Sequence, residues 1–169
     1  MKIAIFNGSP RNENTAAMAE AFAEGAKAAG HEVEIYHVGR MKIGGCLACE
    51  YCHGKGEGKC IQKDDMDKLM PAYQESDMIV FASPLYYASL TAQLEAAIQR
   101  VYPIGKPAKA TKAALLLSSA SGVYDAAIAR YKAYTGFTGI DDMGICTATG
   151  EENKSEAKLA EIRAFAEKL

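Results

Sequence analysis

The sequence predicts an α/β domain in which five parallel strands form a sheet between two layers of helices. Short apolar runs of strand length alternate along the chain with segments whose apolar residues recur at helical spacing. This alternation is typical of parallel sheets with right-handed crossovers. One core comfortably serves a chain of 169 residues, so we expect a single domain over residues 1–169.

The N-terminal part of the chain shows the alternation most clearly. Residues 3–6 are a short continuous apolar run, as expected for a strand that is covered on both faces. Over residues 15–29, apolar side chains such as Met18 and Phe22 recur at helical spacing, and Gly30 ends the pattern. Residues 33–38 alternate between apolar and polar side chains, which predicts a second strand.

The rest of the chain repeats the same alternation. A further helix begins near Asp64 and Asp65, since an aspartate side chain can cap a first turn. The final helix places Leu159, Ile162 and Phe165 on one side. We expect the doubly wound strand order 2-1-3-4-5 of flavodoxin-like domains. The elements between these helices are a strand at 78–82, a helix at 91–102, a strand at 113–117, a helix at 124–134 and a weaker strand at 143–147.

Composition excludes several classes of function. The net charge of −2, with 24% charged residues, provides no basic surface for nucleic acid. No apolar run approaches the about 20 residues that span a bilayer, so we expect no membrane partner. The apolar run after Met1 and Lys2 is too short for the core of a signal peptide. We therefore expect a cytoplasmic protein.

The loop after the first strand has the composition of a phosphate site. In doubly wound sheets, ligands bind beyond the carboxyl ends of the strands. Ser9 and Thr15 can donate hydroxyl hydrogen bonds there, and Arg11 can pair with an anion through two N–H groups. The start of the following helix adds free backbone N–H groups. The alternative is an ordinary surface turn in which Asn14 or Thr15 caps the helix.

Three loops at the ends of predicted strands carry distinctive motifs. The motifs are Gly8-Ser9-Pro10-Arg11 with Asn14-Thr15, Ser83-Pro84-Leu85-Tyr86-Tyr87, and Ser119-Ala120-Ser121-Gly122. Together they resemble the loops of NAD(P)H-dependent FMN reductases and their relatives, the iron-sulfur flavoproteins. The first two motifs are specific and the third is weaker, while the similarity extends over essentially the whole chain. The resemblance implies that FMN is bound by Ser9, Arg11, Asn14, Thr15, Pro84, Leu85, Tyr86, Tyr87, Ser119 and Gly122.

The resemblance also implies a reaction. FMN would take a hydride from NADH or NADPH and pass electrons to a small acceptor such as a quinone, a free flavin, an azo compound or a nitro compound. No side chain is assigned as a catalytic acid or base. The apolar stretch from Leu85 to Ala88, with Leu90, would be a costly exposed patch in a monomer, so we expect a homodimer. The rival interpretations are an electron-transfer protein without pyridine-nucleotide activity and a non-redox regulator that uses the same fold.

A segment at about residues 39–63 fits neither period and contains most of the cysteines. Loops of this length in compact domains are usually functional or disordered. The spacing Cys46-x2-Cys49-x2-Cys52-x7-Cys60 could ligate a [4Fe–4S] cluster or a zinc ion. It resembles the compact motif of iron-sulfur flavoproteins, in which the cluster would feed electrons to FMN. The alternative, which our main prediction of a cluster-free enzyme adopts, is that these thiols pack under a loop or are residues from an ancestral site. We expect Cys146 to be a buried small hydrophobe.

Overall fold

The computed structural model describes residues 1–169 and contains one sheet of five parallel strands. The strand order is β2-β1-β3-β4-β5, which confirms the predicted doubly wound topology. All five predicted strands are present. Their bounds are β1 Lys2–Asn7, β2 Glu32–Tyr36, β3 Met78–Pro84, β4 Lys112–Ser119 and β5 Asp141–Thr149.

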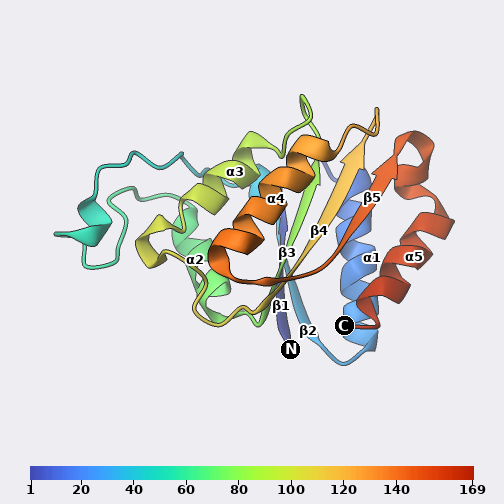
Figure 1. The fold of residues 1–169 in the computed structure, drawn as a ribbon, viewed down its shortest axis with the longest axis horizontal. Helices are drawn as coiled ribbons and strands as arrows, with labels where there is room; N and C mark the ends of the chain where they lie inside the picture. Colours follow the sequence, from blue (N-terminus) through green and yellow to red (C-terminus); the bar gives the residue numbers. More distant parts are fainter.

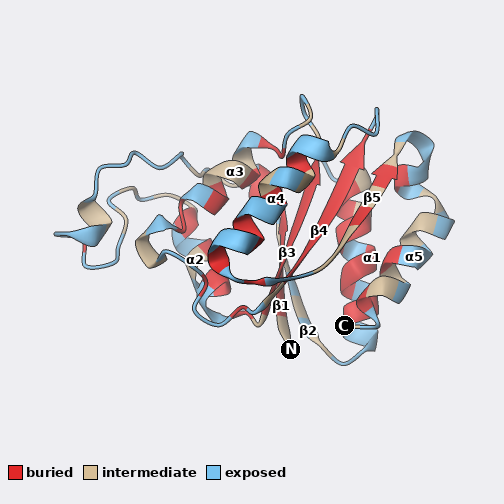
Figure 2. Cartoon of the chain, viewed as in Figure 1, coloured by how far each residue is buried: buried red, intermediate tan, exposed pale blue.

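Helices cover both faces of the sheet, and the alternation of side chains along each strand decides which helices a residue meets (Figure 1). In β1, Ile3 and Ile5 join the core under α1 and α5, whereas Ala4 and Phe6 join the core under α2, α3 and α4. The three central strands are buried on both faces, as their continuous apolar runs predicted (Figure 2). The helices are α1 Asn14–Ala28, α2 Met66–Glu75, α3 Ala92–Gln99, α4 Asp125–Thr138 and α5 Glu156–Ala166.

The largest differences from the predicted bounds lie at helix ends. α3 ends at Gln99 rather than near residue 102, and a short 3-10 turn with Pro103 at its start follows. A proline in that turn cannot continue the backbone hydrogen bonding of a helix. α4 runs on to Thr138, because the residue that ends it is Gly139, whose φ of 73° lies in the left-handed region. None of the helices has the length and apolar character that crossing a membrane requires.

The cysteine-bearing segment extends from the body of the domain as an arm (Figure 1). Between the 3-10 turn η1, Val38–Arg40, and α2, its only regular structure is the short turn η2, Tyr51–His53. The two ends of the arm are joined at its base by aspartate side chains. The carboxylate of Asp65 accepts from the N–H of Lys42 at 2.8 Å, and that of Asp64 accepts from the N–H of Gly44 at 3.1 Å.

Candidate functional site

The carboxyl ends of β1, β3, β4 and β5 surround a cavity of about 360 Å³. This is the edge of the sheet where doubly wound proteins bind their ligands. Arg11 is the only charged residue in the wall, so the local electrostatics favour an anionic ligand. The cavity is lined by Arg11, Asn14, Pro84, Leu85, Tyr86, Ser118, Ser119, Ala120, Gly150 and Asn153.

The loop after β1 is shaped by its own polar side chains. The Asn7 side chain accepts from the N–H of Ser9 at 2.9 Å. The Ser9 hydroxyl donates to the carbonyl of Arg11 at 2.9 Å and accepts from the N–H of Arg11 at 3.2 Å. Ser9 is buried and does not line the cavity. Its hydroxyl therefore holds the loop in shape rather than facing the space in which a ligand would lie.

The loop after β1 is held in place by two neighbouring segments that pack closely against its backbone. A Cβ atom at Gly39 would lie 2.2 Å from the carbonyl carbon of Ser9. At Gly8, a Cβ atom would lie 2.5 Å from the hydroxyl of Thr91, which donates to the carbonyl of Gly8 at 2.9 Å. Any larger residue at either position would displace the loop, so the segment after β2 and the start of α3 both fix its position.

The beginning of α1 faces the cavity without a side-chain cap. The residue before the helix is Glu13, whose side chain makes no capping hydrogen bond, so the predicted alternative of a helix capped by Asn14 or Thr15 is not observed. Thr15 is buried, and its hydroxyl lies 2.7 Å from that of Ser118. The side chain of Arg11 is 60% exposed, and its one ionic contact is Glu13 at 3.8 Å. Arg11 is therefore free to pair with an anion in the cavity.

The loop after β3 presents one tyrosine to the cavity and one to solvent. The N–H of Leu85 donates to the carbonyl of Ser118 at 2.9 Å, which joins the ends of β3 and β4. Tyr86 lines the cavity and is 43% exposed. Tyr87 has a φ of 50° and is fully exposed, at 106%, and it does not line the cavity. The structure therefore brings only the first of the two predicted tyrosines to the site.

The loop after β4 contributes its first residues. Ser119 lines the cavity, and its hydroxyl accepts from the N–H groups of Ser121 and Gly122 at 3.1 and 3.2 Å. Gly122 has a φ of 72°, which a tight turn requires, and it lies outside the cavity wall. Of the ten predicted binding residues, the six in the wall are Arg11, Asn14, Pro84, Leu85, Tyr86 and Ser119. The four that do not line it are Ser9, Thr15, Tyr87 and Gly122.

Four wall residues were not among the ten predicted binding residues, although Ala120 lies within the third loop motif: Ser118, Ala120, Gly150 and Asn153. Two of them belong to the 3-10 turn η4, Gly150–Lys154, which follows the carboxyl end of β5. The signal that identifies this turn is its place directly after the carboxyl end of β5, because ligands of doubly wound sheets bind at carboxyl strand ends.

The four clustered cysteines border one narrow recess in the arm, with Arg100 and Tyr102 in the same wall. The recess holds only about 20 Å³, and no three His, Cys, Asp or Glu side chains come together as a metal-binding group anywhere in the chain. The donor atoms are those that a [4Fe–4S] cluster uses, but their arrangement here does not fit one. Cys146 is buried as predicted, and burial raises the pKa of its thiol to about 11.

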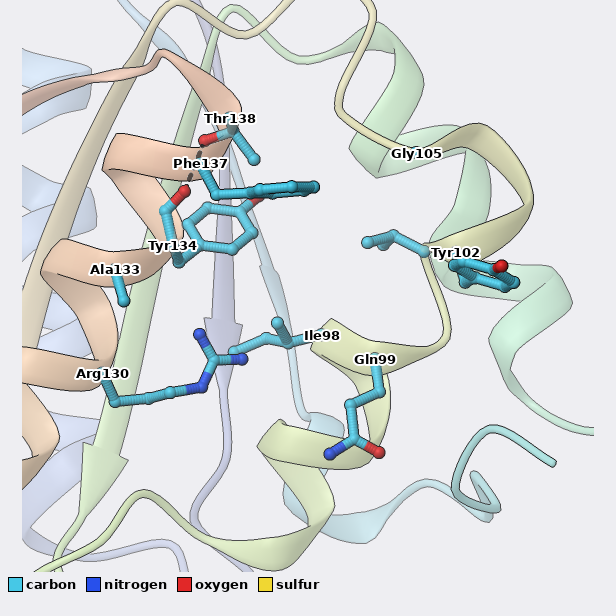
Figure 3. Close-up of a pocket in the computed structure, with 10 residues that line it drawn as sticks. Ile98, Gln99, Tyr102, Gly105, Arg130, Ala133, Tyr134, Phe137 and Thr138 are labelled. Carbon is cyan, nitrogen blue, oxygen red and sulfur yellow. Dashed lines mark hydrogen bonds between the residues drawn. The ribbon is translucent and has the colours of Figure 1, made fainter. Parts of the chain in front are cut away.

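A more apolar pocket of about 250 Å³ lies between α3 and α4, away from the predicted binding motifs (Figure 3). Tyr134 and Phe137 form one wall, and Phe137 is 82% exposed. The cation at this pocket, Arg130, is already paired with Glu95 at 3.0 Å. The pocket has neither a free cation nor a strand end, so the cavity at the carboxyl edge remains the candidate site.

Comparison with known proteins gives matches at the level of family and of fold. The chain matches the family described as NADPH-dependent FMN reductase over residues 1–164. A protein named iron-sulfur flavoprotein from Archaeoglobus fulgidus is 42% identical over 106 residues, which are 62% of this chain and 47% of that protein. A protein of the same name from Methanocaldococcus jannaschii is 36% identical over 100 residues, which are 59% of this chain and 50% of that protein. The chain thus spans about half the length of these curated relatives.

Solved structures share the fold at low sequence identity. An azoreductase from Bacillus anthracis is 19% identical and superposes with a TM-score of 0.76, covering 100% of both chains. An NAD(P)H:quinone oxidoreductase from Methanothermobacter marburgensis is 19% identical, with a TM-score of 0.70 over 99% of this chain and 92% of the other. These two likenesses establish the common fold.

Proposed function

Because the chain belongs to the NADPH-dependent FMN reductase family, we propose that it is an FMN-dependent oxidoreductase. In this proposal it takes a hydride from NADH or NADPH and passes electrons to a small acceptor. FMN, when bound, supplies the redox chemistry, and the chain supplies binding and orientation.

The observation that carries the proposal is the cavity at the carboxyl edge of the sheet. Its single charged side chain is Arg11, and the uncapped start of α1 with Asn14 lies beside it. Free N–H groups at a helix start together with a guanidinium suit a phosphate monoester. Pro84, Leu85 and Tyr86 offer the apolar and aromatic surface that a planar ring needs. The same cavity thus offers an apolar surface for the isoalloxazine ring of FMN and hydrogen-bond donors for its phosphate.

The acceptor class is the less constrained part of the proposal. Tyr86 is partly exposed at the mouth of the cavity, so a small planar molecule could approach a ring held against it. Structural neighbours are named azoreductase and NAD(P)H:quinone oxidoreductase, which supports testing azo dyes and quinones first. Free flavins and nitro compounds are the remaining candidates from the family resemblance.

Titration and turnover test this function. Protein stripped of ligand should bind FMN in a 1:1 ratio, observed as quenched flavin fluorescence, and should then oxidise NADH or NADPH when a quinone or an azo dye is supplied. FMN uptake without nicotinamide oxidation would instead favour an electron-transfer protein. A protein that does not bind FMN would favour the non-redox regulator.

The names of the curated relatives favour a second candidate, an iron-sulfur flavoprotein that transfers electrons. The arrangement of Cys46, Cys49, Cys52 and Cys60 does not support it, because no three of their sulfurs are placed to hold a metal. We therefore derive no electron path through a cluster. Iron and sulfide analysis decides between the candidates.

We also propose a homodimer, on a smaller apolar surface than the sequence suggested. Leu90 is only 5% exposed and contributes to the core rather than to a surface patch. Tyr86 and Tyr87, which belong to the predicted apolar stretch, are 43% and 106% exposed and support association. Sedimentation velocity should give the mass of two chains, and a single species of 18.1 kDa would rule the dimer out.

A further inference from the structure

Asn153 holds an unusual position in the wall of the candidate FMN cavity. It lies in η4, just beyond the carboxyl end of β5, and is 3% exposed. The turn is held by a capping box in which the side chains of Thr149 and Glu152 each accept a backbone N–H of the other residue. The capping box holds the backbone around Asn153, and the Asn153 side chain adds a hydrogen bond to Gly150 within the same turn.

The amide of Asn153 is oriented by two hydrogen bonds. Its Nδ2 donates to the carbonyl of Ser119 at 3.0 Å and to that of Gly150 at 2.7 Å. Only the nitrogen can donate to two carbonyl oxygens, so the position of Oδ1 follows from these bonds. Oδ1 is buried and has no hydrogen-bond partner. Most buried side-chain oxygens are paired, so an unpaired one in a cavity wall leaves an acceptor position that a donor group of a bound molecule can fill.

The contacts of β4 show which part of a flavin would lie nearby. The hydroxyl of Ser118 contacts Thr15 in the first turn of α1, and the carbonyl of Ser118 accepts from Leu85 in the loop after β3. The end of β4 thus lies between the expected phosphate end and the expected ring end of the cavity. Asn153 is bonded to the next residue, Ser119. Between the phosphate and the ring of FMN lies the ribityl chain, whose hydroxyl groups can donate, whereas an ionised phosphate can only accept.

We propose that Oδ1 of Asn153 accepts a hydrogen bond from a ribityl hydroxyl, so that the site selects flavins with a polyol chain over the bare ring. The inference rests on the proposed function, because it assumes that this cavity holds FMN. It assigns a specificity-determining contact to the turn after β5, which none of the three predicted binding loops includes.

Binding measurements with three flavins test this role. Riboflavin carries the ribityl chain, lumiflavin carries a methyl group in its place, and neither has a phosphate. In Asn153→Leu, the ratio of riboflavin affinity to lumiflavin affinity should fall about five- to tenfold. The ratio of FMN affinity to riboflavin affinity should not change, because the phosphate contacts lie elsewhere. An unchanged riboflavin-to-lumiflavin ratio, with normal FMN binding, would overturn the role of Asn153.

Thr149→Ala is the matched control, because it weakens the capping box and leaves the Asn153 side chain intact. This variant should keep the wild-type riboflavin-to-lumiflavin ratio. An equal fall in both variants would show that the shape of the turn, rather than the amide oxygen, selects the ligand, and it would overturn the inference.

Wild-type protein provides a second measurement that does not depend on the folding of a variant. Riboflavin analogues that each lack one ribityl hydroxyl should include one that binds about five- to tenfold more weakly than riboflavin. Equal affinity for the whole series would overturn the inference while leaving FMN binding intact. Failure of wild-type protein to bind FMN would overturn the proposed function as well, so the two failures are distinguishable.

Discussion

The guanidinium of Arg100 donates to both carboxylate oxygens of Asp64, from Nη1 at 2.6 Å and from Nη2 at 3.1 Å. Arg100 is 1% exposed, and its Nη1 also donates to the carbonyl of Gly44 at 2.9 Å. Arg100 immediately follows α3, whereas Gly44 and Asp64 lie at the two ends of the arm. The pair therefore ties the base of the arm to the body of the domain.

Removing the carboxylate charge should destabilise the fold. Asp64→Asn leaves the buried guanidinium without a counter-charge, and breaking such a pair typically lowers the free energy of unfolding by about 3–5 kcal/mol. Urea unfolding followed by circular dichroism measures the change. The control is Glu75→Gln, which breaks the exposed ion pair with Lys2 and should have a much smaller effect. Equal effects of the two substitutions would contradict a special role for Asp64.

The ion pair between Asp64 and Arg100 also predicts that the stability of the fold depends on pH. Burial by itself raises the pKa of Asp64, but hydrogen bonds from Arg100 and from the N–H groups of Gly44 and Met66 outweigh it and lower the pKa below the usual 3.8. A carboxyl whose pKa is lower in the folded state stabilises the fold above its unfolded pKa, and this stabilisation is lost as the pH falls through the folded value. Wild-type protein should therefore lose stability below about pH 4. The unfolding midpoint of Asp64→Asn should fall less steeply over that range, and parallel profiles would contradict the assignment.

Arg11→Ala should weaken FMN binding with little effect on the stability of the ligand-free protein. The Arg11 side chain is mostly exposed and makes only a long contact to Glu13, so folding depends little on it. A charge-assisted hydrogen bond to a phosphate is worth roughly 1.5–3 kcal/mol. Fluorescence titration should show FMN affinity falling by about 10- to 100-fold. Arg40→Ala removes a nearby cation outside the cavity wall, and an equal loss there would show that general positive charge suffices.

Tyr86→Ala and Tyr87→Ala should differ in their effects on the flavin. Tyr86 lines the cavity and Tyr87 points into solvent from a left-handed backbone position. We expect Tyr86→Ala to change flavin fluorescence and the rate of acceptor reduction, and we expect Tyr87→Ala to leave the spectrum of bound flavin unchanged. If the double variant had a normal spectrum and normal turnover, the ring would lie elsewhere.

The pattern of apolar residues along the chain was enough to predict most of the fold. The continuous apolar runs of β1, β3 and β4 predicted parallel strands that helices cover on both faces. The strand order, which the structure confirms, came from the typical order of flavodoxin-like domains and not from these runs. Individual side chains at the site were less predictable. Tyr86 and Tyr87 are chemically identical neighbours, and they meet different surroundings in a turn where Tyr87 and Ala88 both have a positive φ. Leu90 appeared to be an exposed apolar residue because the fold of the loop that buries it leaves no local pattern.

The contribution of Asn153 could not be read from its neighbours in sequence either. Asn153 lies in a turn after the edge strand β5, and a hydrogen bond to the carbonyl of Ser119, which is distant in sequence, holds it at the site. In the same way, no local spacing indicates that Arg100 lies beneath the arm, because the contact depends on where α3 ends. The sequence pattern did not predict which single polar side chains would contact residues that are distant in the chain.

The cysteines of the arm provide the last prediction, because the structure and the names of the relatives point in different directions. Cys46 and Cys49 are exposed, Cys52 and Cys60 are partly exposed, and Cys146 is buried. If the four clustered sulfurs are free thiols, they should react with a thiol reagent in the native protein, and Cys146 should react only after unfolding. Burial and the raised pKa of Cys146 both slow that reaction.

Iron analysis of anaerobically purified protein completes this test. The cluster-free enzyme should contain no acid-labile sulfide and should show only the two visible flavin bands. Cys49→Ser should then leave the visible spectrum unchanged. It should lower the free energy of unfolding only slightly, because an exposed thiol makes few packing contacts. A ratio of about four irons per FMN, with broad absorbance beyond the flavin bands, would contradict the cluster-free enzyme. In that case the Cys49→Ser variant should lose the iron absorbance and still bind FMN, because the FMN cavity and the cysteine recess share no wall residue.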